Sequence, residues 1–279
     1  MRVFLTGATG YVGKAVTLAL RQRGHEVAAL VRPESDSTQL RESGVFIVAG
    51  DLDSLPNLAK TLTAYDALVH TAFSSQDPVA KDKMAVDTLS AQKNFFLYTS
   101  GVWVLGNTKG KTLDEKSPLN PLQIVAWRPT HEKIALDSGG AVIRPGCVYG
   151  GAQSMFADWF VAADQKKPIK IAGDGNNRWA LIDLSDLADC YVRAIEQRKP
   201  GILHAVDDSH ASLNDCAKAL APSGKIEHVP ASGFMAEALT VDQMVSSEAT
   251  RRALGWLPRR TFINSIDEQR REFRAATRG

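Results

Sequence analysis

The chain has 279 residues, of which 44% are hydrophobic and 23% charged, and its formal net charge is +2. A chain of this length and ordinary composition can bury a large core, with room for one domain and a smaller lobe. The small net charge argues against nucleic acid as a partner, and no apolar run approaches the ~20 residues needed to cross a membrane. The three cysteines, Cys147, Cys190 and Cys216, are too far apart for a disulfide framework or a metal site. We therefore expect a cytoplasmic protein without a bound metal.

A glycine-rich segment, TGATGYVG at residues 6–13, separates an apolar run at 3–5 from an apolar, helix-like run at 15–20. Glycines at such a strand-to-helix turn allow a tight turn, a close approach to a pyrophosphate, and packing of the helix on the strand. The helix N-terminus adds unpaired N–H groups and a positive dipole end. The alternative is a tight turn that binds nothing. We predict a dinucleotide site here, at Gly7, Thr9, Gly10, Tyr11, Val12 and Gly13. A cleavable signal would remove this segment, so we expect none.

Further short apolar runs, separated by helical stretches, predict the other strands of the same sheet. They lie at residues 27–31, 45–48, 67–70, 95–98, 141–143 and 201–206. Continuous apolar runs of this length are typical of parallel strands buried on both faces. The sequence therefore predicts an α/β fold, with a doubly wound (Rossmann) parallel sheet of about seven strands and ligands beyond the strand carboxyl ends.

We predict two parts in the chain. The dinucleotide-binding domain comprises residues 1–150 and 178–206, and a smaller C-terminal substrate lobe comprises 151–177 and 207–279. Residues 184–195 carry apolar side chains at helical spacing, with Asp183 or Ser185 in position to cap a helix.

The end of the second strand selects between NAD and NADP. An acidic residue there would bind the ribose 2′-hydroxyl of NAD, but no carboxylate lies between Val31 and Glu34, and the strand ends in Arg32. A guanidinium can bind a 2′-phosphate through two hydrogen bonds. We therefore predict NADP in preference to NAD. The alternative is an arginine that merely extends from a strand end into solvent.

The spacing Gly7-x-x-Gly10-x-x-Gly13, with Thr6 in front, resembles the short-chain dehydrogenase/reductase superfamily, and in particular its extended and atypical branches. The segment Arg-Pro-Gly-Cys-Val-Tyr-Gly at 144–150 and the Leu-Gly-Trp at 254–256 resemble the same group. The resemblance implies the fold predicted above, and a homodimer built through a four-helix bundle is common in the family. It also implies that further residues line the cofactor: Asp51, Leu52, Thr71, Ala72, Phe73 and Pro145.

The catalytic pattern of this family is altered in the chain. Its reductases use a Ser or Thr after the fifth strand and a Tyr-x-x-x-Lys pair, in which the lysine favours the phenolate that moves a proton. Here Gly101 and Ile124 occupy the hydroxyl and tyrosine positions, and Arg128 replaces the lysine. We expect Ser100 to orient the substrate, Arg128 to hold the nicotinamide ribose, and His131 to serve as an alternative acid or base. The alternatives are a packing serine and an exposed helix histidine.

The resemblance also implies substrate contacts in the second half of the chain, at Tyr149, Arg178 and Trp179. The alternative for Arg178 is a structural ion pair with Asp183 or Asp186.

Three functions are consistent with these patterns. The leading one is an NADP-binding oxidoreductase that acts on a small carbonyl or hydroxyl substrate. The second is a non-catalytic regulator that senses NADP(H), because such proteins keep the glycine loop and lose the tyrosine. The third is a nucleotide-sugar epimerase or dehydratase. In each case the partner is a small molecule, and neither nucleic acid nor membrane is expected.

Overall fold

The computed structural model describes residues 1–277. Its centre is a seven-stranded sheet in the order β11-β7-β5-β4-β1-β2-β3, in which all neighbouring strands are parallel. The strands are β1 (Arg2–Thr6), β2 (Glu26–Val31), β3 (Phe46–Ala49), β4 (Ala67–His70), β5 (Phe95–Thr99), β7 (Ala141–Pro145) and β11 (Gly201–Ala205). The predicted fold class is confirmed. The strand order reverses between β1 and β4, where open α/β sheets bind their ligands.

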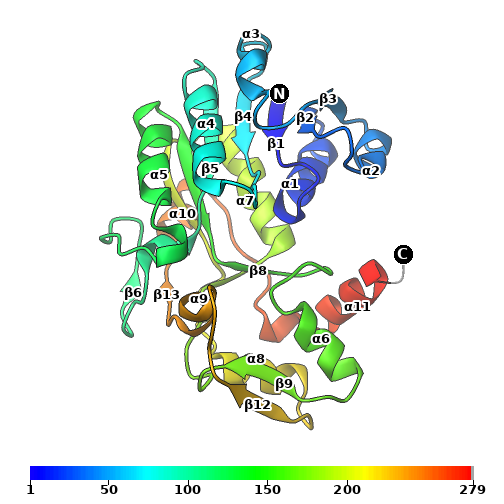
Figure 1. Ribbon diagram of the computed structural model, residues 1–279, viewed down its shortest axis with the longest axis vertical. Coiled ribbons are helices and arrows are strands. Elements are labelled where there is room, and N and C mark those ends of the chain that lie inside the picture. Colours follow the sequence, from blue (N-terminus) through cyan, green and yellow to red (C-terminus); the bar gives the residue numbers. More distant parts are fainter. Residues whose placement is uncertain (278–279) are drawn as a thin grey trace.

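Helices cover both faces of this sheet (Figure 1). One face packs on α1 (Tyr11–Gln22), α2 (Thr38–Glu42), α7 (Leu184–Gln197) and α10 (Glu248–Leu254). The other face packs on α3 (Ala59–Leu62), α4 (Pro78–Ser90) and α5 (Arg128–Asp137). Strand residues alternate between the two cores: Val3 and Leu5 face α1 and α7, whereas Phe4 faces the opposite layer. The sheet is therefore apolar on both sides, as its continuous apolar runs require.

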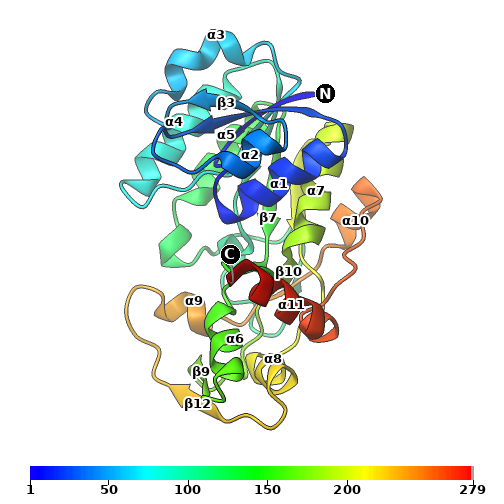
Figure 2. The same ribbon diagram turned by 90° about the vertical axis from the view of Figure 1, so that its right-hand side faces the viewer.

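A smaller lobe lies beyond the carboxyl ends of the strands (Figure 2). It contains α6 (Ala157–Asp164), β9 (Ile169–Ala172), α8 (Leu213–Leu220), β12 (Ile226–Val229), α9 (Ala236–Thr240) and α11 (Ile266–Thr277). Its own core is rich in aromatic side chains, among them Phe156, Trp159, Trp179 and Phe262. Two short parallel pairs connect it to the sheet: β8 (Cys147–Tyr149) with β10 (Leu181–Asp183), and β6 (Thr112–Leu113) with β13 (Met244–Val245).

Packing assigns two stretches differently from the domain boundaries that the sequence suggests. Leu254 and Trp256 belong to the core of the α1 and α7 face, and the Trp256 indole donates to the Asp186 carbonyl at 3.0 Å. This stretch, expected in the lobe, therefore packs on the main sheet. Trp179, expected in the sheet domain, packs in the lobe core. Burial of an apolar side chain is favourable against any apolar surface that is near it in space, whatever the position of the residue along the chain.

The three cysteines are buried and free. Within residues 1–277 no cluster of His, Cys, Asp and Glu side chains has the arrangement of a metal site. The same residues include no helix that is both long and apolar enough to cross a membrane.

Candidate functional site

The glycine loop is in very close contact with the end of β4. Gly7 has a φ of +83°, and a Cβ there would lie 2.5 Å from the backbone nitrogen of Ala72. A Cβ on Gly13 would lie 2.5 Å from the Thr71 hydroxyl and closer still to the Gly7 carbonyl. Side chains at these positions would separate α1 from the sheet. The glycines are therefore required for the packing of helix on strand, as the sequence predicts.

The N-terminus of α1 carries no cap from a side chain. Gly10 is the N-cap residue, and the first turn contains no acidic residue. Thr9 and Gly10 are exposed. The first N–H groups of this 12-residue helix and the positive end of its dipole therefore face solvent at the carboxyl edge of the sheet, where they suit an anion.

A cavity of about 630 Å³ adjoins this loop. Five of the predicted site residues line it: Tyr11, Phe73, Ser100, Arg128 and Pro145. The other lining residues are mainly apolar and include Trp103, Ile124, Val125, Trp127, Cys147, Met155 and Phe234. The structure thus brings the glycine loop, the end of β5 and the start of α5 to one cavity.

Ser100 and Trp103 each bring a buried polar atom without a partner to this cavity. Ser100 is only 7% exposed, and its Oγ has no hydrogen-bond partner among the described residues. Its backbone N–H is occupied, since it donates to the Ile143 carbonyl at 2.8 Å. Burial of a hydroxyl without a hydrogen-bond partner costs free energy, unless a ligand or a water molecule supplies that partner. Ser100 is therefore placed to bind a polar atom of a ligand.

Arg128 is held firmly at the cavity wall. Its Nη1 donates to the Thr99 carbonyl at 2.7 Å and to the Tyr98 hydroxyl at 3.2 Å, and its guanidinium lies 4.6 Å from the centre of the Trp127 ring. α5 starts at Arg128, and Pro129 is suited to its first turn. Ile124 lies in the preceding 3₁₀ turn, Gln123–Val125, and also lines the cavity.

His131 does not face the cavity, so its predicted role as an acid or base has no geometric support. It is 2% exposed, and its Nδ1 lies 2.6 Å from Oδ2 of Asp82. The expectation of an exposed histidine is wrong as well. The His131 ring packs on the Trp127 ring, with ring centres 4.9 Å apart. Trp127 lines the cavity, whereas His131 does not.

Asp82 is the centre of a buried polar network. Its Oδ2 also accepts from the Tyr98 hydroxyl at 2.8 Å, and its Oδ1 lies 3.3 Å from Nε2 of His70. Nδ1 of His70 in turn lies 2.6 Å from the Thr6 hydroxyl. Burial alone would raise the pKa of Asp82, but hydrogen bonds from His131 and His70 hold it well below its usual value. The network connects the strand before the glycine loop to Arg128.

The sequence contained a signal for Asp82 that residue types alone do not reveal. This aspartate precedes Ala85, Val86 and Leu89, so it lies on the buried face of α4 at helical spacing. An acidic residue on an apolar helix face requires a buried partner. That pattern predicts a buried partner for Asp82 but does not identify it.

The three predicted substrate contacts do not line this cavity. Tyr149 is fully buried, its hydroxyl donates to Asp207 at 3.3 Å, and burial raises its pKa far above the usual value. Arg178 pairs with Asp242, with Nε–Oδ1 and Nη2–Oδ2 distances of 2.8 and 2.6 Å, rather than with Asp183 or Asp186. Trp179 is 4% exposed and lines a separate cavity of about 560 Å³ inside the lobe. The geometry thus gives these three residues structural contacts.

The residues predicted to bind the adenosine part lie at the ends of β2 and β3. Val31 and Ala49 are paired in the sheet, so the segments that follow them are adjacent. The Arg32 side chain is 64% exposed and lies 3.5 Å from Glu34. Asp51 is exposed and accepts from the Ser54 N–H at 2.9 Å. Neither side chain is held in the protein interior. Leu52 packs partly on the core behind them.

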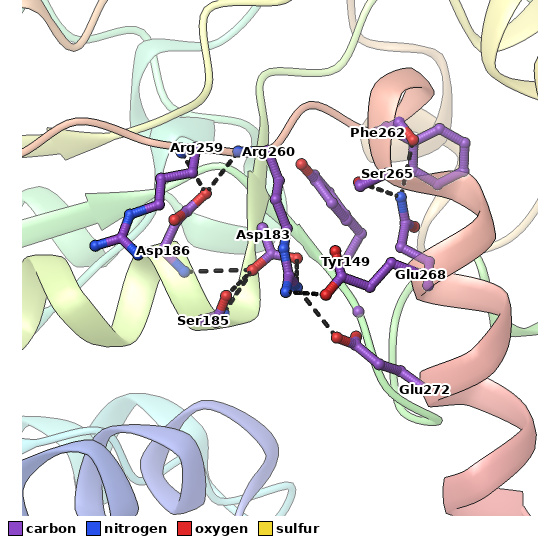
Figure 3. A network of polar contacts seen from close by, with 12 residues as sticks. Tyr149, Asp183, Ser185, Asp186, Arg259, Arg260, Phe262, Ser265, Glu268 and Glu272 are labelled. Atoms are coloured by element: carbon purple, nitrogen blue, oxygen red, sulfur yellow. Dashed lines mark hydrogen bonds and ion pairs between the residues drawn. The ribbon is translucent and has the colours of Figure 1, made fainter. Parts of the chain in front are cut away.

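A network of charged residues joins the start of α7 to α11 (Figure 3). Arg260 contacts Asp183 at 3.3 Å, Glu272 at 3.1 Å and Glu268. The Tyr11 hydroxyl donates to the Gly150 carbonyl beside this cluster. Burial raises the pKa of Tyr11 above its usual value, and Asp183 and Glu272 add to the shift. Tyr11 is therefore a neutral hydroxyl that is already engaged, and it joins the glycine loop to the lobe.

From residue 3 to residue 113, the chain matches the sequence model of the NAD dependent epimerase/dehydratase family. This match confirms the predicted resemblance for residues 3–113. The family model covers the glycine loop and the first five strands of the central sheet.

Curated proteins and solved structures are also similar to this chain. An uncharacterized protein of Schizosaccharomyces pombe is 29% identical over 92% of this chain and 95% of its own length. A 3-diazoavenalumate denitrifying reductase of a Streptomyces species is 28% identical over 92% and 96% of the two chains. The crystal structure of dTDP-glucose 4,6-dehydratase from Bacillus anthracis, in complex with NAD, superposes with a TM-score of 0.85 at 15% identity, covering 99% and 97% of the two chains. At that identity the superposition establishes the fold.

Proposed function

We propose that this protein is a nicotinamide-dependent oxidoreductase that prefers NADP(H) and acts on a small carbonyl or hydroxyl substrate. One observation carries the proposal: the glycine loop and the partnerless Ser100 hydroxyl border the same cavity, through Tyr11 on one side and Ser100 on the other. A dinucleotide held at the N-terminus of α1 extends along the carboxyl edge of the sheet toward this cavity. The names of the relatives, a reductase and an NAD-containing dehydratase, support the same class.

The residues present fit such a cofactor. Gly7 and Gly13 leave no room for a Cβ against Ala72 and Thr71, so the glycine loop forms a close-packed cradle in which the uncapped start of α1 suits a pyrophosphate. Arg32 would hold the 2′-phosphate, and Asp51 would contact the adenine amino group. Phe73 and Pro145 would line the nicotinamide end. When bound, the cofactor supplies or accepts the hydride.

The side chains around the cavity have different roles in the proposed reaction. Ser100 donates its free hydroxyl to the substrate oxygen and orients it, and Arg128 places a positive charge beside the same space. Ile124 cannot transfer a proton. Burial raises the pKa of the Cys147 thiol to about 12, so this thiol is not a nucleophile at neutral pH. Water therefore provides the proton that the family's tyrosine would otherwise supply.

One observation favours a second function, the NADP(H)-sensing regulator. Ile124, at the position of the family's tyrosine, lines the cavity with an inert side chain. A sensor needs the cradle but no proton donor. The nucleotide-sugar reading is weaker, because Arg178, which the resemblance would place on substrate phosphates, is occupied by Asp242.

Two measurements test the proposal. Titration of the protein into NADPH and NADH, followed by nicotinamide fluorescence, should show binding that is at least about tenfold tighter for NADPH. A screen of aldehydes and ketones should then show NADPH oxidation that falls about tenfold or more in Ser100→Ala while NADPH affinity is retained. Tight NADPH binding without turnover of any compound would favour the sensor. Absence of binding to either dinucleotide would refute both functions.

A further inference from the structure

The cavity beside the glycine loop is walled almost entirely by apolar and aromatic side chains. Trp103 and Trp127 line it, together with Ile124, Val125 and Met155. Among its described lining residues, Arg128 is the only charged one. Ser100 Oγ and Trp103 Nε1 are its buried polar atoms without a partner among the described residues. A site with this composition favours an apolar ligand oriented by a small number of polar groups.

Large apolar side chains converge on the cavity mouth from distant parts of the chain. Phe73, Met155 and Phe234 are 68%, 39% and 80% exposed, and all three line the cavity. Phe73 follows β4 of the main sheet, whereas Phe234 lies just before α9 of the lobe. Exposed phenylalanines that face one space from two sides are typical of a binding site, because each loses its contact with water when a ligand binds.

The charge in this cavity does not suit a diphosphate. The guanidinium of Arg128 already donates to Thr99 and Tyr98 and stacks on Trp127. Recognition of a nucleotide diphosphate requires several donors arranged around its oxygens. The next candidate, Arg178, is paired with Asp242 and lies outside the lining of the cavity.

We infer that the substrate is an uncharged aromatic aldehyde or ketone, whose ring packs against Phe234 and Phe73 and whose carbonyl oxygen accepts a hydrogen bond from Ser100. This inference rests on the proposed oxidoreductase function. In the reductive direction the carbonyl carbon gains a hydride from reduced nicotinamide, which is oxidised. The π electrons of the C=O bond move to oxygen, and that oxygen takes a proton from water to give an alcohol.

The first test compares substrates. Benzaldehyde, hexanal, 4-carboxybenzaldehyde and UDP-glucose are each assayed with the dinucleotide that binds. We expect kcat/KM for benzaldehyde to exceed that for hexanal at least tenfold, because aromatic pairs add to simple burial. We expect no turnover of UDP-glucose. Equal values for benzaldehyde and hexanal, or turnover of UDP-glucose in preference to both, would overturn the inference.

The second test uses Phe234, which the cofactor is not expected to touch. Phe234→Ala should raise KM for benzaldehyde about tenfold with little change in NADPH affinity, and Phe234→Tyr should restore it. Phe46→Ala is the matched control, since Phe46 is 69% exposed on β3 and does not line the cavity. An unchanged KM in Phe234→Ala would contradict the inference.

A third measurement separates this inference from the proposed function. Trp103 and Trp127 line the cavity, so benzyl alcohol should quench tryptophan fluorescence without any cofactor. Quenching that weakens in Phe234→Ala, in a protein that binds no dinucleotide, would refute the proposed function and retain the aromatic site. NADPH binding without quenching and without turnover of aromatic compounds would refute the aromatic site and retain the proposed function.

Discussion

Asp82 and His131 are joined by a hydrogen bond of 2.6 Å between Oδ2 and Nδ1. The bond connects α4 to α5 inside the layer that covers one face of the sheet. Because the same carboxylate oxygen accepts from Tyr98, and Tyr98 accepts from Arg128, the position of Arg128 at the cavity depends on Asp82.

Replacing Asp82 should therefore affect both stability and the site. We expect Asp82→Asn to lower the free energy of unfolding by about 2–4 kcal/mol, because buried hydrogen bonds to a charged group are lost and partners remain unsatisfied. Urea denaturation at pH 7 measures this. Asp87→Asn is the control, since Asp87 is exposed on the same helix and its pair with Lys83 should contribute less than about 0.5 kcal/mol.

The Asp82 contribution should also depend on pH. Its folded-state pKa lies below the unfolded value, so the contribution is present above the unfolded pKa and is lost as the pH falls toward the folded pKa. The urea midpoint should fall between pH 5 and pH 3, where the unfolded carboxyl titrates at about 3.9, and it should fall less in Asp82→Asn. Parallel pH profiles for the two proteins would contradict this assignment.

Asp207 should behave in the opposite way. Burial raises its pKa from 3.8 to about 6, so its ionised form destabilises the folded state, and stability falls as the pH rises from about 4 to 6. Asp207→Asn should stabilise the protein at pH 7.5 by up to about 3 kcal/mol, with the difference vanishing below pH 4. The Ser209 N–H donates to Oδ1 of Asp207 at 2.9 Å, and the amide oxygen of an asparagine at this position can still accept that hydrogen bond.

Asp174→Asn provides the comparison for this effect. Asp174 also accepts from a nearby backbone N–H, but it is exposed and that hydrogen bond lowers its pKa. The substitution should not stabilise the protein at pH 7.5. Thermal unfolding of both variants at pH 4 and pH 7.5 distinguishes them, and a gain for Asp174→Asn equal to that for Asp207→Asn would exclude burial as the cause.

Arg260 neutralises a carboxylate that is almost completely buried. Asp183 is 1% exposed, and it also accepts from the Ser185 and Asp186 N–H groups at the start of α7. Arg260→Met should cost about 2–4 kcal/mol, because it leaves Asp183 without its countercharge. Arg252→Met removes an exposed pair with Glu248 and should cost less than about 0.5 kcal/mol. Chemical denaturation of the two variants gives both values.

Arg32 decides the expected cofactor preference. Arg32→Asp should weaken NADPH binding about 10- to 150-fold, since charge-assisted hydrogen bonds contribute roughly 1.5–3 kcal/mol. NADH affinity should change much less. Arg2→Asp makes the same charge change at the start of β1, away from the site, and should leave both affinities unaltered. Equal loss in the two variants would mean that Arg32 acts only through overall charge.

Local patterns were sufficient for the sheet and the cradle. Each strand is a short apolar run, and Gly7 and Gly13 act through contacts with the chain segments that such a turn must bring together. The family resemblance placed Ser100, Arg128 and Pro145 near the cofactor, and the structure brings all three to one cavity. Ser100 directly follows β5, Arg128 begins α5 and Pro145 ends β7. These features depend on spacing along the chain.

The sequence by itself determined that this protein has a doubly wound sheet with a glycine cradle at its carboxyl edge. Tertiary structure decided what surrounds the cradle. His131 faces Asp82 across 49 positions, Arg178 pairs with Asp242 across 64, and Phe234 joins Phe73 at a single cavity. Such partners are selected by burial and by the need to satisfy charges once the layers pack, and no local pattern in one sequence encodes that selection.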